Sequence, residues 1–491
     1  MNKKNNRLII PMLLLSLCSG CQVGPDYRSP SVIMPEEWPV VERQKDPMEK
    51  IRETENLTQW WTTLEDPALN DLIKRTISNN RDLKIALTRI RQARAALGLA
   101  HRQLHPNVTG SALYRRTQSG TPSAEDPDPG AFSMGSDYYN AGFDASWEID
   151  LFGKKQRSIE ATVAELGVSE EGYRGILISM VSETAGNYVR LRTLQKQLDI
   201  VSRNLEMQEK ALAILEDKSA AGLIGSLQVQ QAKYNVENTR ARIPGYRVSI
   251  EESMNTIAVL LGEMPGGLHD ELSAPGRIPV PGVEILIGIP ADILRRRPDI
   301  RQAERALAAQ TAKVGAATAD LYPSFRLSGV LGFTASSIDT LFSDESAALN
   351  ISPFISIPLF NRNRIRDQIE IQNAVQERTL IEYETTVLDA IKEVRDGIMA
   401  YSEEQKRYKI LEKGTAEAQS ALDLANERFR SGLVDFMDVL DAQRALLSFE
   451  ENQIGSRGAI TLDLIHLYKA LGGGWDTESL ENHHKKALTD K

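Results

Sequence analysis

The chain has 491 residues, a formal net charge of -9 and a pI near 5.5. This acidic balance argues against a nucleic-acid-binding surface, because such surfaces need clustered lysine and arginine. Aromatic residues make up only 6% of the chain, which argues against one large globular core. The organisation of the chain must therefore be inferred from the order and periodicity of its predicted elements.

The first residues have the pattern of an export signal. A basic start, an apolar run too short to span a bilayer and small residues before Cys21 predict a signal peptide over residues 1–20. The setting of Cys21 resembles the bacterial lipobox, which implies cleavage before this cysteine and its acylation, for example by palmitate. A free thiol is the alternative. The residue after this cysteine is Gln22. An aspartate at this position in bacterial lipoproteins would direct retention in the inner membrane, so Gln22 indicates the outer membrane. Residues 21–58 are predicted to form a lipidated, extended N-terminal arm, because they are rich in proline and charge.

A first repeat is predicted over residues 59–262, and it begins with helices. Asp66 and Pro67 suit the cap and first turn of a helix from about 67 to 79. A second helix covers about 82 to 104 and stops before Pro106.

The periodicity of the first repeat then changes from helical to alternating. Apolar and polar residues alternate in two segments, which predicts strands at about 107–116 and 138–150. A helical hairpin follows at about 154–262, with a turn at residues 221–223 and a kink at Pro244. The connector that comes next, residues 263–292, is rich in proline and glycine.

The sequence then repeats itself over residues 293–474. Asp82, Gly98 and Pro106 correspond to Asp299, Gly315 and Pro323 at one constant offset. The second repeat is predicted to contain a helix, two strands and a helical hairpin, in that order. Its strands lie at about 324–334 and 348–358, its hairpin at about 361–471, and a polar tail follows at 475–491.

The hairpin of the second repeat contains the longest helical pattern of the chain. Every seventh residue from Val387 to Phe429 is apolar or aromatic except Thr415, which indicates a coiled-coil-like seam. No proline follows Pro358. Gly432 suits the left-handed residue that closes a helix, so the chain turns back at this point.

The strands place a constraint on assembly. The segment at 138–150 has the length of a tilted transmembrane strand with one apolar face, although a two-faced strand in a soluble sheet has the same pattern. Four transmembrane strands cannot close a barrel, and open edges are not tolerated in lipid. If the strands span a membrane, several chains must therefore contribute to one barrel.

Three motifs resemble a known family, namely residues 21–27, Trp60-Trp61 with Asp66-Pro67, and residues 296–304. They resemble the bacterial outer-membrane efflux channels of the TolC-like type, in the lipoprotein branch that serves resistance-nodulation-division pumps. The resemblance implies a mainly α mixed fold, with four strands per chain in a trimeric, 12-stranded β-barrel and long hairpins in a periplasmic α-barrel.

The resemblance also implies a function. The chain would be a passive exit duct for drugs or other small toxic compounds, and so a factor in antibiotic resistance. Its partners would be two further copies of itself, a periplasmic adaptor protein, an inner-membrane pump and outer-membrane lipid, with no nucleic acid. The alternatives are the outer-membrane duct of a protein secretion system and a periplasmic coiled-coil lipoprotein scaffold without a pore.

The same resemblance implies a periplasmic gate at the tip of the second hairpin. Asp438 and Asp441 match a ring of pore-lining aspartates, and Phe429 matches an aromatic residue that helps to hold the closed tip. Val434 replaces an arginine that some relatives use there. The alternative for both aspartates is stabilisation of a helix N-terminus through its dipole.

The sequence contains no convincing catalytic constellation. His101 and His105 lie four residues apart on a predicted helix but have no evident third ligand, so solvated side chains are the favoured interpretation. The prediction is therefore a protein with no enzymatic activity, no metal site and no cofactor.

Overall fold

The computed structural model describes residues 22–30, 55–118, 135–280 and 295–475. The predicted signal peptide and Cys21 lie outside these ranges. The chain divides into two compact units. We call residues 1–31, 90–169 and 303–383 the sheet unit, and residues 32–89, 170–302 and 384–491 the hairpin unit.

Within the described residues, the element order repeats and the fold is mainly helical with four strands, as predicted. The first set is α4 (Arg81–Arg102), β1 (Asn107–Gln118), β2 (Gly135–Ile149), α5 (Lys154–Ala220), α6 (Ser226–Arg240) and α7 (Ile243–Leu260). The second set is α10 (Pro298–Ala319), β3 (Ser324–Ala335), β4 (Ala347–Ser356), α11 (Arg362–Arg430) and α12 (Phe436–Ala470). Shorter elements are α2 (Glu55–Thr58), η1 (Trp60–Leu64), α3 (Pro67–Asn79), α8 (His269–Leu272) and η2 (Asp344–Ser346).

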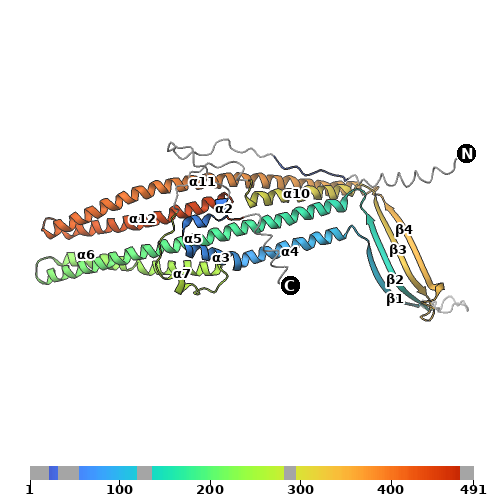
Figure 1. Cartoon of the computed structure of the whole chain (residues 1–491), viewed down its shortest axis with the longest axis horizontal. Helices are drawn as coiled ribbons and strands as arrows, with labels where there is room; N and C mark the ends of the chain where they lie inside the picture. The colour runs from blue at the N-terminus through green and yellow to red at the C-terminus, as the bar shows by residue number, and fades with distance from the viewer. Residues whose placement is uncertain (1–21, 31–54, 119–134, 281–294, 476–491) are drawn as a thin grey trace, which may run out of the picture. The chain divides into compact units, whose positions relative to one another are not determined.

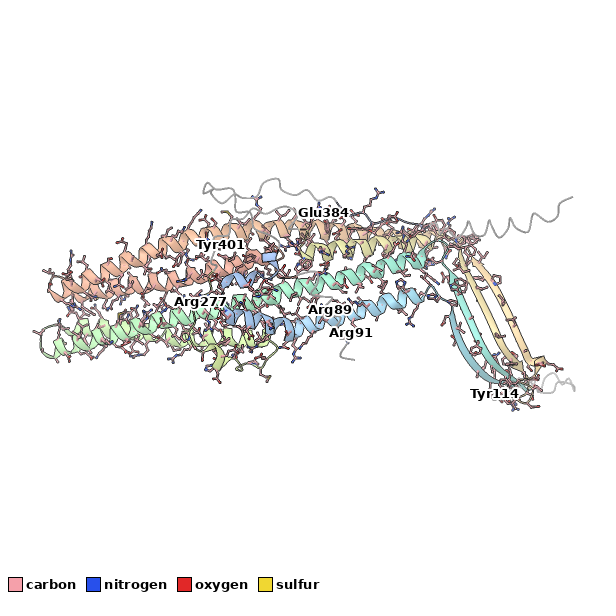
Figure 2. All side chains as sticks on the ribbon, in the orientation of Figure 1. Arg89, Arg91, Tyr114, Arg277, Glu384 and Tyr401 are labelled. Atoms are coloured by element: carbon pink, nitrogen blue, oxygen red, sulfur yellow. The ribbon has the colours of Figure 1, made fainter. Side chains whose placement is uncertain are left out.

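The sheet unit contains one antiparallel sheet with the strand order β1-β2-β3-β4 (Figure 1). The register aligns Phe143 of β2 with Leu331 of β3, and Leu331 with Leu349 of β4, so apolar residues form a row across one face. Tyr114 of β1, which Figure 2 labels, lies opposite Tyr139 of β2 with ring centroids 4.8 Å apart. Both outer strands, β1 and β4, have one edge without a strand partner among the described residues.

The strands differ slightly from their predicted bounds. The pair Gln118 and Gly135 closes the β1–β2 ladder, so hydrogen bonding extends both strands into a segment that composition alone marks as loop. Pro353 lies inside β4, opposite Leu327. A proline is tolerated there because β4 is an edge strand, where one row of amides has no partner.

The helical hairpins of the hairpin unit are built on long helices. The predicted heptad seam of α11 faces inward, since Val387, Val394, Leu422 and Tyr401, the last labelled in Figure 2, are buried. The kink predicted at Pro244 separates α6 from α7, although Ala241 and Arg242 between them keep helical backbone angles. Pro244 stands in the first turn of α7, because its ring would clash with a carbonyl of the preceding turn and it has no amide to donate.

A small apolar core holds the shorter elements of the hairpin unit. Asp66 caps α3 as predicted, accepting hydrogen bonds from the amides of Ala68 and Leu69. The Trp60 ring stacks on Tyr468 of α12, with centroids 5.2 Å apart. Trp475, predicted as the first residue of a polar tail, is buried here, because the guanidinium of Arg174 lies 4.6 Å from its ring.

None of the helices in the described ranges is both long enough and apolar enough to cross a membrane.

Candidate functional site

The candidate site lies at the tip of the second helical hairpin, in the hairpin unit. α11 ends at Arg430, and Gly432 has a φ of 72°, a left-handed conformation that suits glycine. The amide of Leu433 donates to the carbonyl of Arg428 at 2.9 Å, which closes the helix end. The predicted helix-closing role of Gly432 is therefore confirmed.

The first helical hairpin ends in the same kind of turn. Gly222 has a φ of 73°, and the amide of Leu223 donates to the carbonyl of Lys218 at 2.9 Å. The two leucines that follow the glycines, Leu223 and Leu433, are 73% and 74% exposed. The duplication has thus preserved both the turn geometry and an apolar side chain at each apex.

A shared apolar cluster joins the two tips. It consists of side chains from the ends of α5, α6, α11 and α12. The buried members are Leu215, Val229, Ala232, Ala418, Leu422, Phe436, Val439, Leu440 and Leu446.

Phe429 belongs to the edge of this cluster. Its ring lies 5.3 Å from that of Phe436, and the ammonium of Lys218 lies 4.9 Å from its centroid. Burial of two aromatic rings together with a cation–π contact stabilises the packing of α11 against α5 and α12. Within one chain, Phe429 therefore contributes to the contact between the hairpins.

Asp438 and Asp441 lie one turn apart on the exposed face of α12, whereas Val439 and Leu440 between them are buried. The cluster thus fixes the helix rotation that turns both carboxylates to the outside. Asp438 lies in the first turn, where the helix dipole favours a negative charge. Asp441 lies beyond that turn, and its carboxylate is 3.4 Å from the guanidinium of Arg444.

Arg444 is a further residue of the tip, and it was not predicted from the sequence. Its Nε donates to Oδ1 of the buried Asn235 on α6 at 2.9 Å, and its guanidinium lies 5.6 Å from the ring of Tyr234. Arg444 therefore joins α12 to α6 beside the Asp441 carboxylate. Arg444 and Tyr234 occupy equivalent positions in the two repeats. The internal repeat of the sequence could therefore have indicated that these two side chains lie close together.

Further along the hairpins, Glu451 of α12 is a second link between the repeats. It accepts hydrogen bonds from Arg242 at 2.6 Å and from the Tyr246 hydroxyl at 2.7 Å. Burial, together with the nearby Glu451 carboxylate, raises the pKa of Tyr246 to about 12. The tyrosine therefore remains a hydrogen-bond donor at neutral pH.

The sheet offers two chemically different faces. Phe143, Leu331 and Leu349 form the apolar row and are strongly exposed in the single chain. Asp144 and Arg326 lie on the opposite face, because neighbouring residues of a strand alternate between faces.

Of the remaining predicted sites, Cys21 lies outside the described residues. Within the described ranges, no group of three or more histidine, cysteine or acidic residues could hold a metal ion, and His101 and His105 are exposed. Arg297 is buried and bonds to the carboxylates of Asp299 and Glu393.

Comparisons with known proteins agree on one family. The family model described as outer membrane efflux protein matches residues 72–263 and 289–473. The chain is 30% identical over 471 residues to the solvent efflux pump outer membrane protein SrpC of Pseudomonas putida, covering 95% of this chain and 98% of that protein. It is 28% identical over 467 residues to the cation efflux system protein CusC of Escherichia coli O6:H1, again covering 95% and 98%.

Solved structures give the same result. The outer-membrane channel OprN superposes with a TM-score of 0.84 at 33% identity, covering 93% of this chain and 100% of that one. A CusC structure superposes with a TM-score of 0.79 at 26% identity, covering 92% and 100%.

Proposed function

The chain belongs to the outer membrane efflux protein family, and from that premise we propose that it is the outer-membrane exit duct of a tripartite efflux pump. The duct would be passive, with no catalytic activity of its own. The observation that carries this proposal is the sheet, which has one apolar face, one polar face and two unpaired edges.

The open edges support a homotrimer. Unpaired strand edges are not tolerated in lipid, so β1 and β4 need partners from other copies of the chain. A membrane barrel needs about eight strands at least. Two copies would meet that minimum, whereas three copies would give the twelve strands that the family resemblance implies.

We propose drugs or other small toxic compounds as cargo. The relatives carry names that refer to solvents, toluene and cations, although they share the same family. This variety is consistent with selection of the cargo by the pump rather than by the duct. A periplasmic adaptor and an inner-membrane pump are the proposed partners, and the exposed Leu223 and Leu433 at the hairpin apices are suited to an adaptor contact.

The proposed location is the outer membrane, with the helical hairpins extending into the periplasm. We further propose that Cys21 is acylated and anchors the chain there. The lipobox resemblance supports this anchor, as does Gln22 at the position that follows the cysteine.

Asp438 and Asp441 are the proposed selectivity and gate residues. Three copies of an exposed carboxylate pair around one axis would attract cations and repel anions. Phe429 would act indirectly, by holding the hairpin tips together through its contact with Lys218 of the first hairpin.

A conductance measurement tests the gate. Purified protein in planar bilayers should form a cation-preferring pore, and the Asp438→Asn, Asp441→Asn double variant should conduct with a clearly reduced cation preference. Asp389→Asn, which removes an exposed carboxylate of α11 away from the tip, is the matched control and should behave like the wild type. A protein that forms no pore in either form would contradict the proposed function, whereas an unchanged preference would contradict only the role of the two aspartates.

A further inference from the structure

Three side-chain amides are buried where the two helical hairpins meet, within the hairpin unit. Gln208 of α5 is 3% exposed, Asn235 of α6 is 2% exposed and Gln443 of α12 is 8% exposed. Each amide comes from a different helix. We call these three residues the amide layer.

Two close contacts show how α5 and α12 are aligned. A Cβ added at Gly458 of α12 would collide with Oγ1 of Thr193 on α5. A Cβ added at Gly455 would lie 3.4 Å from Nε2 of Gln197. The contact positions rise along α5 as they fall along α12, so the two helices run in opposite directions.

The same alignment brings the members of the amide layer together. Both helices advance by the same distance per residue, so Gln208 stands level with Gln443. Asn235 is linked to α12 at this level, because Nε of Arg444 donates to its Oδ1 at 2.9 Å.

On α5, the amide layer interrupts the apolar contact between the hairpins. Val201 belongs to a second apolar cluster, which also contains Ile200 and Leu447. Leu215 belongs to the cluster at the tips. Gln208 lies between these two residues along the helix, so a polar side chain separates two apolar contacts.

Most hydrogen-bonding atoms of the amide layer have no partner among the described residues. Oε1 and Nε2 of Gln208, Nδ2 of Asn235 and Oε1 of Gln443 are all buried and unpaired. These atoms are already shielded within one chain, so a neighbouring copy cannot supply their partners. A buried amide without a partner costs the packed state free energy, which hydration of the amide would recover.

The internal repeat shows that packing does not require an amide at this position. Gly222 and Gly432 align α5 with α11, and the same offset makes Ala418 the counterpart of Gln208. Ala418 is a buried member of the apolar cluster at the tips. The amide of Gln208 is therefore a feature of the first hairpin alone.

We propose that the amide layer opposes tight packing of the two hairpins and so favours separation of their tips. While the hairpins are packed, the four polar atoms lack partners, whereas water pairs with them once the hairpins separate. The apolar cluster favours the packed state, and the amide layer shifts the balance toward the separated one. This inference rests on the proposed function, because separation of the tips is taken to widen the duct.

Gln208→Met in the purified, full-length protein tests this inference. The variant keeps the length of the side chain and removes both unpaired amide atoms. The packed state loses its penalty, so the resting conductance in planar bilayers should fall at least about fivefold. For the same reason, the midpoint of urea unfolding in detergent should rise.

Two further glutamine-to-methionine variants serve as matched controls. Gln195 of α5 is 5% exposed but paired, since it accepts from Arg192 at 2.8 Å and donates to the carbonyl of Leu272 at 2.7 Å. Gln195→Met should therefore lower the urea midpoint. Gln230 of α6 is exposed, so Gln230→Met should match the wild type in both measurements.

The outcomes separate this inference from the proposed function. A higher urea midpoint together with a reduced conductance of Gln208→Met supports the inference. A midpoint that is unchanged or lower overturns it, because the amide would then be paired in the folded protein. A higher midpoint with unchanged conductance also overturns it, although the proposed duct stands. A wild type that forms no pore overturns the proposed function, and with it the role of the layer in separation.

Discussion

Several charged side chains of the hairpin unit are buried, and they have partners from more than one helix. The Glu171 carboxylate on α5 accepts from Arg174 at 2.5 Å and lies 2.9 Å from the Arg301 guanidinium on α10. Glu451 joins α12 to α7 in the same way. A buried charge that loses its partner costs several kcal/mol, so these groups restrict how the helices can be arranged.

The first prediction at the scale of single residues concerns Arg297. It donates to the carbonyl of Ala470 at 2.7 Å and bonds to Asp299 and Glu393. Arg297→Ala should lower the free energy of unfolding by about 2–3 kcal/mol, because the buried carbonyl loses its donor while the two half-exposed carboxylates regain water. Denaturant titration in detergent measures this loss. Arg295→Ala, an exposed neighbour, should change it little, and an equal loss in both variants would refute the argument.

Tyr246 gives a prediction of pH dependence. Its pKa is raised from 10.0 to about 12, so the folded protein keeps the phenol proton more tightly than the unfolded chain does. The corresponding stability is fully present below pH 10 and is lost as the pH rises from about 10 to about 12. Tyr246→Phe should therefore flatten the decline of stability in this window.

Unfolding measured at a series of alkaline pH values checks the Tyr246 prediction. Tyr234→Phe, at a tyrosine that is 62% exposed, serves as the control and should leave the decline unchanged. The same slope in wild type and Tyr246→Phe would show that burial beside Glu451 does not hold the proton.

At the scale of elements, the two helical hairpins are held together near their tips by an apolar cluster and by a polar link. The apolar cluster packs α5, α6, α11 and α12 together. Arg444 adds a polar link between α12 and α6, and it lies next to the carboxylate of Asp441. Any movement that separates these hairpins must break that link and leave the buried Asn235 without its arginine.

Removal of this link should ease separation of the tips. Arg444→Met keeps most of the apolar stem but cannot donate to Asn235, so we expect a higher resting conductance in planar bilayers and a loss of about 1–2 kcal/mol in stability. Arg457→Met, at an exposed position of the same helix, should match the wild type in both measurements. Unaltered conductance of Arg444→Met would mean that the link does not restrain the tips.

At the scale of the whole molecule, the chain is a part of an assembly that we propose to be trimeric. The sheet has two open edges, and its apolar face remains exposed in the single chain. In water, the open edges and the exposed apolar face would favour aggregation. In a membrane, neighbouring copies would pair with the edges and lipid would cover the apolar face.

Substitutions at two neighbouring residues of β4 can distinguish the two faces of the sheet. Ile351 lies on the apolar face and Asn350 on the polar one. Ile351→Lys should cost about 2–4 kcal/mol in a membrane and deplete the outer-membrane fraction. Asn350→Lys should still assemble and instead shift ion preference toward anions. Equal recovery of both variants in the outer membrane would contradict a lipid-facing apolar row.

The sequence by itself determined the elements and their duplication. Helical and alternating periodicities are local properties, so they located the strands and the α11 seam. The residue types alone located the Asp66 cap and the turn at Gly432. The motifs around Trp60 and Arg296 indicated the family. The proposed gate role of Asp438 and Asp441 comes from the resemblance, whereas their exposed placement is fixed by the packing of the apolar cluster.

Only the tertiary structure decided which distant side chains meet. The contact of Arg444 with Asn235, the position of Phe429 in the cluster between the hairpins and the ion pair of Arg157 with Asp26 all join segments that are far apart in sequence. Such contacts depend on helix rotation and on the close approach of backbones, which a single sequence does not encode locally. The burial of Trp475 was likewise decided by packing and not by periodicity.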